Sequence, residues 1–201
     1  TLDEVTKLEP WDRISMVSEP TFQWEPMAEA DAYQIEVKYR ESNERIWVED
    51  VTSDAACDAE VCSFTAAEPL PLGELKWHVR AIRDNVGGAW ADYFILYKSD
   101  TVAVPWQEFP RGGIVYEGSP SFQWESIFEA DSYTIELVGP DGQNTYEMEV
   151  DSSVCSSSLL CEYTSPLELG SDYGGYAWRI KANVGDQSSE WSDTESYQYW
   201  Q

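Results

Sequence analysis

The sequence predicts an all-β chain of two tandem antiparallel β-sandwiches. Residues 21–37 recur as residues 121–137, at an offset of 100 positions and with aromatic and apolar residues in the same order. Within each copy apolar and polar residues alternate, which is typical of strands with one buried and one solvated face. Turn-forming residues separate these runs and leave about seven short strands per copy, as in an immunoglobulin-like sandwich.

The repeat indicates a duplicated domain. Residues 77–81 match residues 178–182, and the period is near 100 residues. Solenoid repeats are much shorter, at about 20–50 residues. We therefore expect a first domain at 1–99 and a second at 100–201.

The start of the two copies matches at a different offset. Pro10-Trp11 matches Pro105-Trp106 at an offset of 95. The second copy is therefore expected to carry about five extra residues near 111–115, which is the difference between the offsets of 100 and 95.

Composition and charge exclude several classes of protein. The chain has 14% aromatic residues, including ten Trp and twelve Tyr, whereas disordered acidic chains are poor in aromatic residues. It has 12 basic and 38 acidic residues, for a formal charge of −26, and both halves are acidic. This charge repels nucleic acid and anionic membrane surfaces, so neither is an expected partner. The sequence has no apolar run long enough to predict a membrane span.

The four cysteines predict two local disulfides. They are Cys57 and Cys62 in the first copy, and Cys155 and Cys161 in the second. Four cysteines allow three pairings, and the local one is favoured because each pair falls at the same place in its repeat. A zinc site is disfavoured because its usual C-x2-C spacing is absent and His78 is the only histidine. Disulfides imply an oxidising compartment, so we expect a secreted or cell-surface protein.

These residues resemble the fibronectin type III family over essentially the whole chain. Trp24 and Trp124 occupy the place of the family's core Trp on the second strand, and Tyr33 and Tyr133 match the Tyr that opens the third strand. Residues 72–77 look like the family's turn into the sixth strand. The resemblance implies a Tyr at that corner, where this sequence has Trp77 and Trp178.

The cysteine pairs extend the resemblance to one variety of the family. A Cys-x4/5-Cys pair followed shortly by a Trp looks like the bacterial extracellular variety, found in multidomain surface proteins and beside polysaccharide-acting modules. The sequence has no Arg-Gly-Asp loop, so integrin-style recognition is not implied. A resemblance of this kind says more about fold than about function.

Catalysis is not expected. A single histidine removes Ser-His-Asp and Cys-His schemes from a duplicated chain, and the sequence has no Gly-rich phosphate loop and no HExxH motif. We therefore expect no enzyme and no required cofactor. Calcium is a weak candidate, because acidic and amide side chains cluster at Asp54, Asp58, Asp141 and Asn144 without an EF-hand pattern.

The tryptophans fall into two groups. Four lie on the buried side of their strands and are expected in the core, namely Trp24, Trp77, Trp124 and Trp178. Four others are candidates for binding, namely Trp11, Trp106, Trp47 and Trp200. Trp11 and Trp106 either plug the end of a sandwich or stack on a sugar ring or a partner chain.

A basic stripe is predicted on the outer face of the first sandwich. If Tyr33, Ile35 and Val37 point inward, five other side chains point outward on two neighbouring strands, namely Lys38, Arg40, Lys76, His78 and Arg80. The simple interpretation is cross-strand pairing with nearby acids such as Glu36. The alternative is a docking face for an acidic partner, including another copy of this chain.

We predict a noncatalytic module of an extracellular or cell-surface protein, of bacterial type, that mediates structural or adhesive contacts with a protein or a glycan. Two alternatives stay open. One is an accessory carbohydrate-binding module of a polysaccharide-acting protein, with the exposed tryptophans as a stacking platform. The other is a subunit of a surface filament or layer that self-assembles through the basic stripe.

Overall fold

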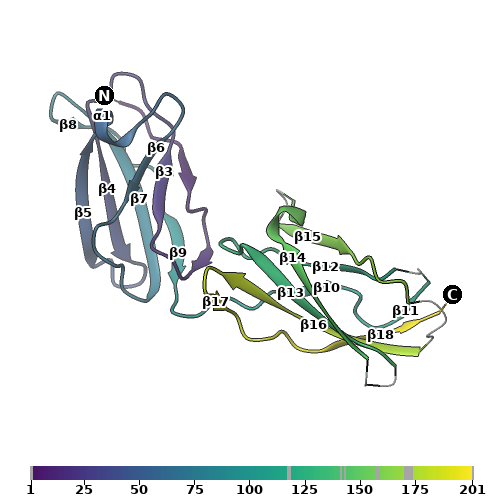
Figure 1. The fold of residues 1–201 in the computed structure, drawn as a ribbon. Helices are drawn as coiled ribbons and strands as arrows, with labels where there is room; N and C mark the ends of the chain where they lie inside the picture. The colour runs from purple at the N-terminus through teal and green to yellow at the C-terminus, as the bar shows by residue number, and fades with distance from the viewer. Residues whose placement is uncertain are drawn as a thin grey trace. The chain divides into compact units, whose positions relative to one another are not determined.

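A computed structural model describes residues 2–116, 119–140, 142, 144–156, 159–169 and 174–200. The chain divides into two compact units, Thr1–Asp100 and Thr101–Gln201, so the boundary falls one residue after the one we expected (Figure 1). Each unit contains a three-stranded and a larger β-sheet. The prediction of an all-β chain of two tandem sandwiches is confirmed.

Unit 1 pairs a small sheet with a large one. The small sheet has the order β1-β3-β6, with β1 Lys7–Glu9, β3 Thr21–Trp24 and β6 Cys62–Thr65. The large sheet has the order β2-β9-β7-β4-β5, with β8 added on β7; its strands are β2 Ile14–Met16, β9 Phe94–Lys98, β7 Gly73–Arg83, β4 Ala32–Tyr39, β5 Arg45–Thr52 and β8 Val86–Gly87. A four-residue helix, α1 Ser53–Ala56, follows β5.

Unit 2 repeats this arrangement. Its small sheet has the order β10-β12-β15, with β10 Gln107–Phe109, β12 Ser121–Glu125 and β15 Leu160–Thr164. Its large sheet has the order β11-β18-β16-β13-β14, with β17 added on β16; its strands are β11 Ile114–Val115, β18 Glu195–Tyr199, β16 Gly174–Val184, β13 Ser132–Val138, β14 Thr145–Asp151 and β17 Gln187–Ser188. A short 3-10 helix, η1 Ser152–Val154, takes the place of α1.

Strand pairing corrects the predicted match at the start of the two copies. Lys7 pairs with Trp24, and Gln107 pairs with Trp124 in the same way. The offset is therefore 100 here too, so Pro10 corresponds to Pro110 and not to Pro105. The predicted offset of 95 and the five extra residues near 111–115 are wrong, because the partner strand sets the register and a shared Pro-Trp dipeptide does not.

The first strand of each unit changes sheets at a proline. In unit 1, β1 belongs to the small sheet, while β2 pairs in parallel with β9 in the large sheet. Pro10 lies between β1 and β2, and Pro110 lies between the equivalent strands of unit 2. Proline has no N–H to donate to a sheet, so pairing is interrupted at this point. The alternation of apolar residues did not predict this division.

Buried tryptophans fill both cores. Trp24, Trp77, Trp124 and Trp178 have no exposed surface. Ring contacts repeat between the units: Phe22 lies 4.8 Å from Trp77, and Phe122 lies 4.9 Å from Trp178. Replacing a buried Trp by Ala typically costs roughly 3–5 kcal/mol, so these rings contribute strongly to the stability of each unit.

Polar groups of the core aromatic residues hold neighbouring loops. The hydroxyl of Tyr33 accepts a hydrogen bond from the Met27 amide at 2.7 Å, and Tyr133 repeats this contact with Ile127 at 2.8 Å. At the corner where the family resemblance implies a Tyr, the Trp178 indole donates to the Pro110 carbonyl at 2.8 Å. An indole therefore makes a corner hydrogen bond in unit 2.

Two disulfides close short loops, as predicted. Cys57 bonds to Cys62 and Cys155 bonds to Cys161, over sequence separations of 5 and 6 residues. Each bond ties the short helix after the edge strand to the last strand of the small sheet. The four sulfurs are therefore joined locally, in the same place in both units.

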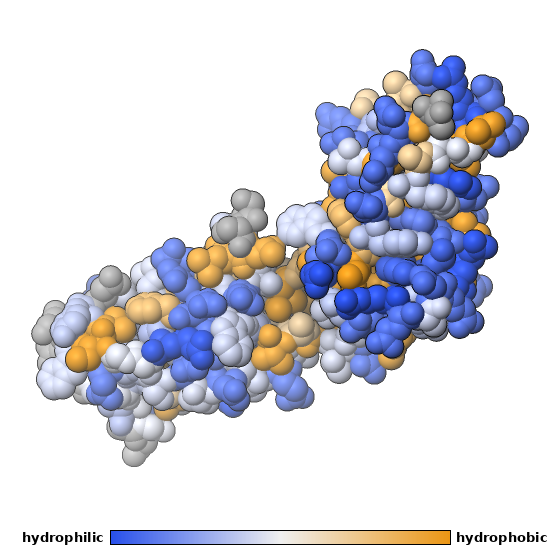
Figure 2. All heavy atoms as spheres, turned by 180° about the vertical axis from the view of Figure 1, so that it is seen from behind, coloured by the Kyte–Doolittle hydropathy of each residue, from blue (hydrophilic) through white to orange (hydrophobic). Residues whose placement is uncertain are grey.

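The face of the molecule that Figure 2 shows is mostly polar. Figure 2 shows hydrophilic residues over much of the visible face, with hydrophobic residues in several separate areas. Within the described residues, no helix is both long and apolar enough to cross a membrane.

Candidate binding surfaces

Unit 1 carries a stack of aromatic and basic side chains on the outer face of its large sheet, with His78 at its centre. His78 lies between two rings, 3.9 Å from Trp90 and 4.0 Å from Tyr93, with interplanar angles of 9° and 19°. The Arg80 guanidinium lies 4.5 Å from the Trp90 ring, and the Lys76 ammonium lies 4.6 Å from the Tyr93 ring. We call these five side chains the unit 1 stack. Cation–π contacts of this kind each contribute about 0.5–2 kcal/mol.

Strand alternation places the three β7 residues of the stack. Lys76, His78 and Arg80 are every second residue of β7, so they share one face. The facing residues of β4 are Glu36, opposite His78, and Gln34, opposite Arg80. The Gln34 carbonyl accepts two hydrogen bonds from Arg80, at 2.6 and 3.0 Å.

Glu36 is the acid around which this face is organised. Its carboxylate is only 3% exposed and contacts Lys38 at 2.7 Å, Arg45 at 2.7 Å and His78 at 2.8 Å. Burial alone raises the pKa of a carboxylate, but the hydrogen bonds from Lys38, His78 and Arg45 outweigh it and lower the pKa of Glu36 to about 2. Glu36 is therefore ionised at neutral pH and neutralises part of the surrounding positive charge.

His78 departs from the predicted basic stripe. The prediction placed its side chain on the outer face, where it does lie, but Trp90 and Tyr93 cover it and leave it 6% exposed. Burial lowers the pKa of His78, and the nearby Glu36 carboxylate offsets this only in part. The imidazole is therefore neutral at pH 7 and donates through Nε2 to Glu36, since an ionised carboxylate only accepts.

The other residues of the stripe are engaged within unit 1. Lys38 pairs with Glu36, and Arg40 pairs with Glu74 at 2.7 Å. Lys76 donates to Asn43. The four charged side chains of the predicted stripe therefore contact partners in the same unit.

Unit 2 has a shorter version of the stack. Arg179 and Lys181 lie 4.5 and 4.9 Å from the Trp191 ring. Arg179 also pairs with Glu136 at 2.7 Å. Arg179 stands where unit 1 has His78, because both residues pair with the equivalent Glu.

The four candidate tryptophans differ in exposure. Trp11, Trp106 and Trp200 are exposed, and Trp106 is the most open at 55%. Trp47 packs against Phe22 at 5.7 Å and Phe64 at 5.8 Å, with its indole N–H buried. Trp47 is partly buried and packs against the core, so less of its ring is open for stacking on a ligand than in the three exposed tryptophans.

Trp106 lines a hollow in unit 2. The hollow has a volume of about 350 Å³, within the range of about 300–1,000 Å³ usual for small-molecule sites. The Arg111 guanidinium lies 4.8 Å from the Trp106 ring and pairs with Glu195 at 3.2 Å. We call this the unit 2 hollow; its lining residues are Val104, Pro105, Trp106, Gln107, Arg111, Trp191, Ser192, Asp193 and Glu195.

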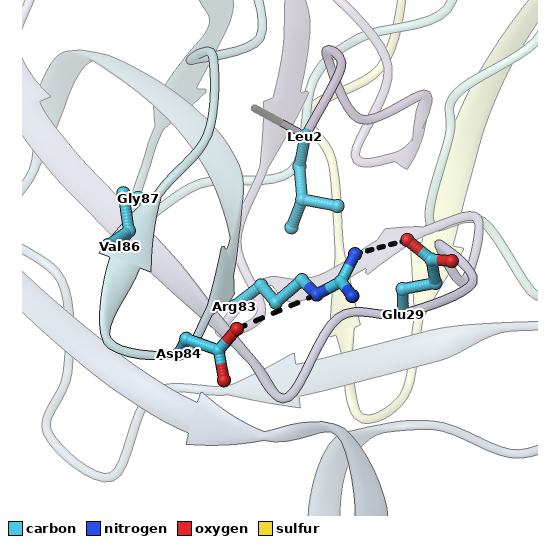
Figure 3. A pocket seen from close by; sticks show the side chains of 6 residues that line it. All are labelled: Leu2, Glu29, Arg83, Asp84, Val86 and Gly87. Atoms are coloured by element: carbon cyan, nitrogen blue, oxygen red, sulfur yellow. Dashed lines mark hydrogen bonds and ion pairs between the residues drawn. The ribbon is translucent and has the colours of Figure 1, made fainter.

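A second hollow lies at the turn between β7 and β8 of unit 1. Figure 3 shows the Arg83 guanidinium reaching between the carboxylates of Glu29 and Asp84, beside Leu2. Its lining residues include no aromatic side chain, and its central cation is already paired. It therefore offers less for a ligand than the unit 2 hollow.

The calcium candidates fall in two places, one in each unit. Asp54 lies in α1, and the Asp58 carboxylate accepts from the backbone amides of Glu60 and Val61 at 2.8 Å, which is ordinary turn chemistry. Asn144 accepts from the Gly139 amide through its backbone carbonyl, and Asp141 lies outside the described residues. Among the residues that the structure describes, no group of three or more His, Cys, Asp or Glu side chains is placed to hold a metal ion.

Similar solved structures include three from chicken. The FN1–FN3 domains of CNTN1 match at a TM-score of 0.48 and 13% identity, covering 99% of this chain and 68% of that one. A two-domain fibronectin type III segment of tenascin matches at 0.35 and 14%, covering 98% of each chain. The interferon gamma receptor alpha chain matches at 0.39 and 13%, covering 96% of this chain and 95% of that one. No family model and no curated protein match the sequence.

The strand order and the disulfides define the class of the protein. It is a tandem of two fibronectin type III-like β-sandwiches, each closed by one local disulfide. The disulfides are consistent with an extracellular location.

Several residues of these surfaces were not identified from the sequence. Tyr93 and Trp90 cover His78, and the Arg111 guanidinium lies over the Trp106 ring, which stays largely exposed. Two aromatic residues, Trp90 and Tyr93, come just before β9, the strand that pairs with β7, and this position could have indicated the contact. The contact does not follow from the sequence, because the alternation of apolar and polar residues along a strand does not give the course of the loop before it.

Proposed function

We propose that this chain is a noncatalytic binding module of an extracellular or cell-surface protein, which contacts a protein or glycan partner. The main support is the exposed indole of Trp106 in the unit 2 hollow, on a sandwich whose core is fully packed. Exposing a large aromatic ring in a concave site is unfavourable in water and is typical of a contact surface.

The rigidity of the sandwiches supports the same proposal. Each unit has a tryptophan-filled core and a local disulfide, so the surfaces it presents keep their geometry on binding. Preorganised surfaces lose little entropy when a partner binds. A bacterial source, inferred only from the cysteine pattern, stays a prediction.

Two finer functions stay as alternatives. An accessory carbohydrate-binding module is favoured by Trp106, whose flat ring can stack on a sugar. A subunit of a surface filament is less favoured, because the basic stripe that would join the copies is paired within unit 1.

The proposal is tested by binding measurements on the oxidised chain. A glycan array and a panel of extracellular matrix proteins are probed with the wild type and with Trp106→Ala, and Trp47→Phe is the matched control in the core. We expect saturable binding that Trp106→Ala weakens and Trp47→Phe does not. Turnover of a glycan into shorter products, measured by chromatography, would contradict a noncatalytic role.

Self-assembly and calcium binding have separate measurements. Light scattering across salt concentrations tests for filaments, and a monomer at all concentrations would remove the filament alternative. A melting temperature that millimolar calcium leaves unchanged would remove the calcium prediction.

A further inference from the structure

The unit 2 hollow has a counterpart in unit 1 that the chain fills with its own lysine. Lys7 and Gln107 correspond because they pair with Trp24 and Trp124. On the opposite sheets, Phe94 pairs with Trp77 and Glu195 pairs with Trp178.

Asp92 and Asp193 also correspond. Ala91 donates to the Val79 carbonyl, and Ser192 donates to the Ile180 carbonyl at the same register position in unit 2. Asp92 and Asp193 are the residues that follow. The same place in the two units is therefore bordered by Lys7, Asp92 and Phe94, or by Gln107, Asp193 and Glu195.

In unit 1 this place holds an ammonium group. Lys7 Nζ donates to the Asp92 carbonyl and lies 3.6 Å from the Phe94 ring centroid and 5.2 Å from that of Trp77. Burial lowers the pKa of Lys7 to about 8, and the carboxylates of Asp92, Asp12 and Glu4 act in the opposite direction. The ammonium is therefore mostly charged at neutral pH, held among aromatic rings and acids.

In unit 2 the lysine is replaced and the place is left open. Gln107 is buried and its amide donates to the Trp178 carbonyl at 3.1 Å. Glu195 adds a carboxylate where unit 1 has Phe94, and Trp106 adds an exposed ring. Asp193 is exposed, and its carboxylate makes no hydrogen bond or ion pair with any residue that the structure describes.

The charge of unit 2 favours a cationic ligand. It has 3 basic and 17 acidic residues, a net −14. All three cations are already engaged: Arg111 with Trp106 and Glu195, and Arg179 and Lys181 with Trp191. An anionic ligand would meet the repulsion of the remaining acids, while a cation would be attracted.

We propose that the unit 2 hollow binds an alkylammonium group, such as a lysine side chain on the surface of a basic partner protein. The inference rests on the proposed function as a binding module and names the chemistry of its partner. The ammonium lies against the Trp106 ring and pairs with Asp193, while Glu195 is shared with Arg111. Unit 1 has no such site because Lys7 fills the corresponding place.

The test follows the indole N–H signals of the full oxidised chain by NMR. The probe is Nα-acetyl-lysine methylamide, and the uncharged control of similar shape is Nα-acetyl-norleucine methylamide. We expect the lysine probe to shift the Trp106 signal saturably, the norleucine probe to leave it unchanged, and added salt to weaken binding.

Variants separate the site from the rest of the chain. Trp106→Ala and Asp193→Asn should each weaken binding about fivefold, the equivalent of about 1 kcal/mol for a cation–π contact or an ion pair. Asp92→Asn, the matched change in unit 1, should leave the affinity unchanged. Gln107→Lys should abolish binding, because it supplies an internal ammonium as in unit 1. Melting curves check that each variant is folded.

Three results would overturn the inference. The first is an unshifted Trp106 signal with the lysine probe in the folded wild type. The second is binding of the lysine probe by folded Asp193→Asn and folded Gln107→Lys with the same affinity as the wild type. The third is a Trp106 signal that glucose or cello-oligosaccharides shift and the lysine probe does not. That third result would leave the proposed binding module in place and identify a glycan as its ligand.

Discussion

At the scale of single residues, polar contacts in unit 1 converge on one buried acid. Glu36 receives hydrogen bonds from Lys38, Arg45 and His78. The corresponding Glu136 pairs with Arg179 and is more exposed. Losing a buried carboxylate that accepts from three donors costs more stability than losing one in a surface ion pair.

Replacing Glu36 by Gln should therefore destabilise unit 1. The substitution leaves Lys38 and His78 without their ionised acceptor in a buried setting, at a cost of about 2–3 kcal/mol. Glu136→Gln is the matched control and should cost about 1 kcal/mol or less. Scanning calorimetry of the full chain measures both, and equal effects of the two substitutions would contradict the role given to Glu36.

His78 should make the stability of unit 1 depend on pH near neutrality. Burial lowers its pKa in the folded state below the ordinary value of 6.5. The unfolded chain then binds more protons as the pH falls through 6.5, so acidification favours unfolding. The stabilisation from neutral His78 is complete above this pH and declines below it.

We expect the melting temperature of unit 1 to fall as the pH is lowered from 7.5 to 5.5. Most carboxylates stay ionised over this range, so they contribute little to the change. His78→Phe keeps a ring between Trp90 and Tyr93 but cannot titrate, so its melting temperature should change much less over this window. A wild type and a His78→Phe variant with the same pH dependence would contradict this account.

At the scale of elements, the disulfides stabilise the link between the edge strand of the large sheet and the small sheet. Each closes a loop of five or six residues. Loops this short give about 2 kcal/mol on the chain-entropy model. The tryptophan core supplies most of the stability, so the fold should survive their loss.

Replacing both Cys57 and Cys62 by Ser should lower the free energy of unfolding of unit 1 by about 2 kcal/mol without abolishing the fold. The Cys155→Ser and Cys161→Ser pair should act similarly on unit 2. Urea unfolding monitored by tryptophan fluorescence measures the change. An unfolded double variant in the absence of urea would show that the core is weaker than its packing indicates.

Some strands could be predicted from the sequence and others could not. Strands β4 and β7 followed from alternation, because each has one face in the core. The division of the first strand into β1 and β2 did not, because both pieces are short and their pairing depends on distant strands. The match of Pro10 to Pro105 failed for the same reason.

At the scale of the whole molecule, negative charge dominates. The chain has 38 acidic and 12 basic residues. Many of the basic residues are held in stacks and ion pairs, so the remaining acids repel one another. Self-repulsion of this kind opposes the compact state and is screened by salt.

Raising sodium chloride from 20 to 500 mM should therefore stabilise the protein. We expect a gain of about 1 kcal/mol, or roughly 4 °C in melting temperature, because screening reduces repulsion among unpaired acids more than it weakens the partly buried pairs. Potassium chloride should act equally, which separates screening from binding of a particular cation. A lower melting temperature in salt would show that the ion pairs matter more than the repulsion.

The sequence by itself determined the duplicated β-sandwich, the local disulfides and the buried tryptophans. These follow from alternation and repetition, which are properties of the chain read in order. Only the tertiary structure decided that Trp90 and Tyr93 cover His78, that Trp47 packs against the core, and that Lys7 fills in unit 1 a place left open in unit 2. Those arrangements depend on contacts between residues 12 to 87 positions apart in the chain, and the packing of loops and strands fixes them where local sequence pattern does not.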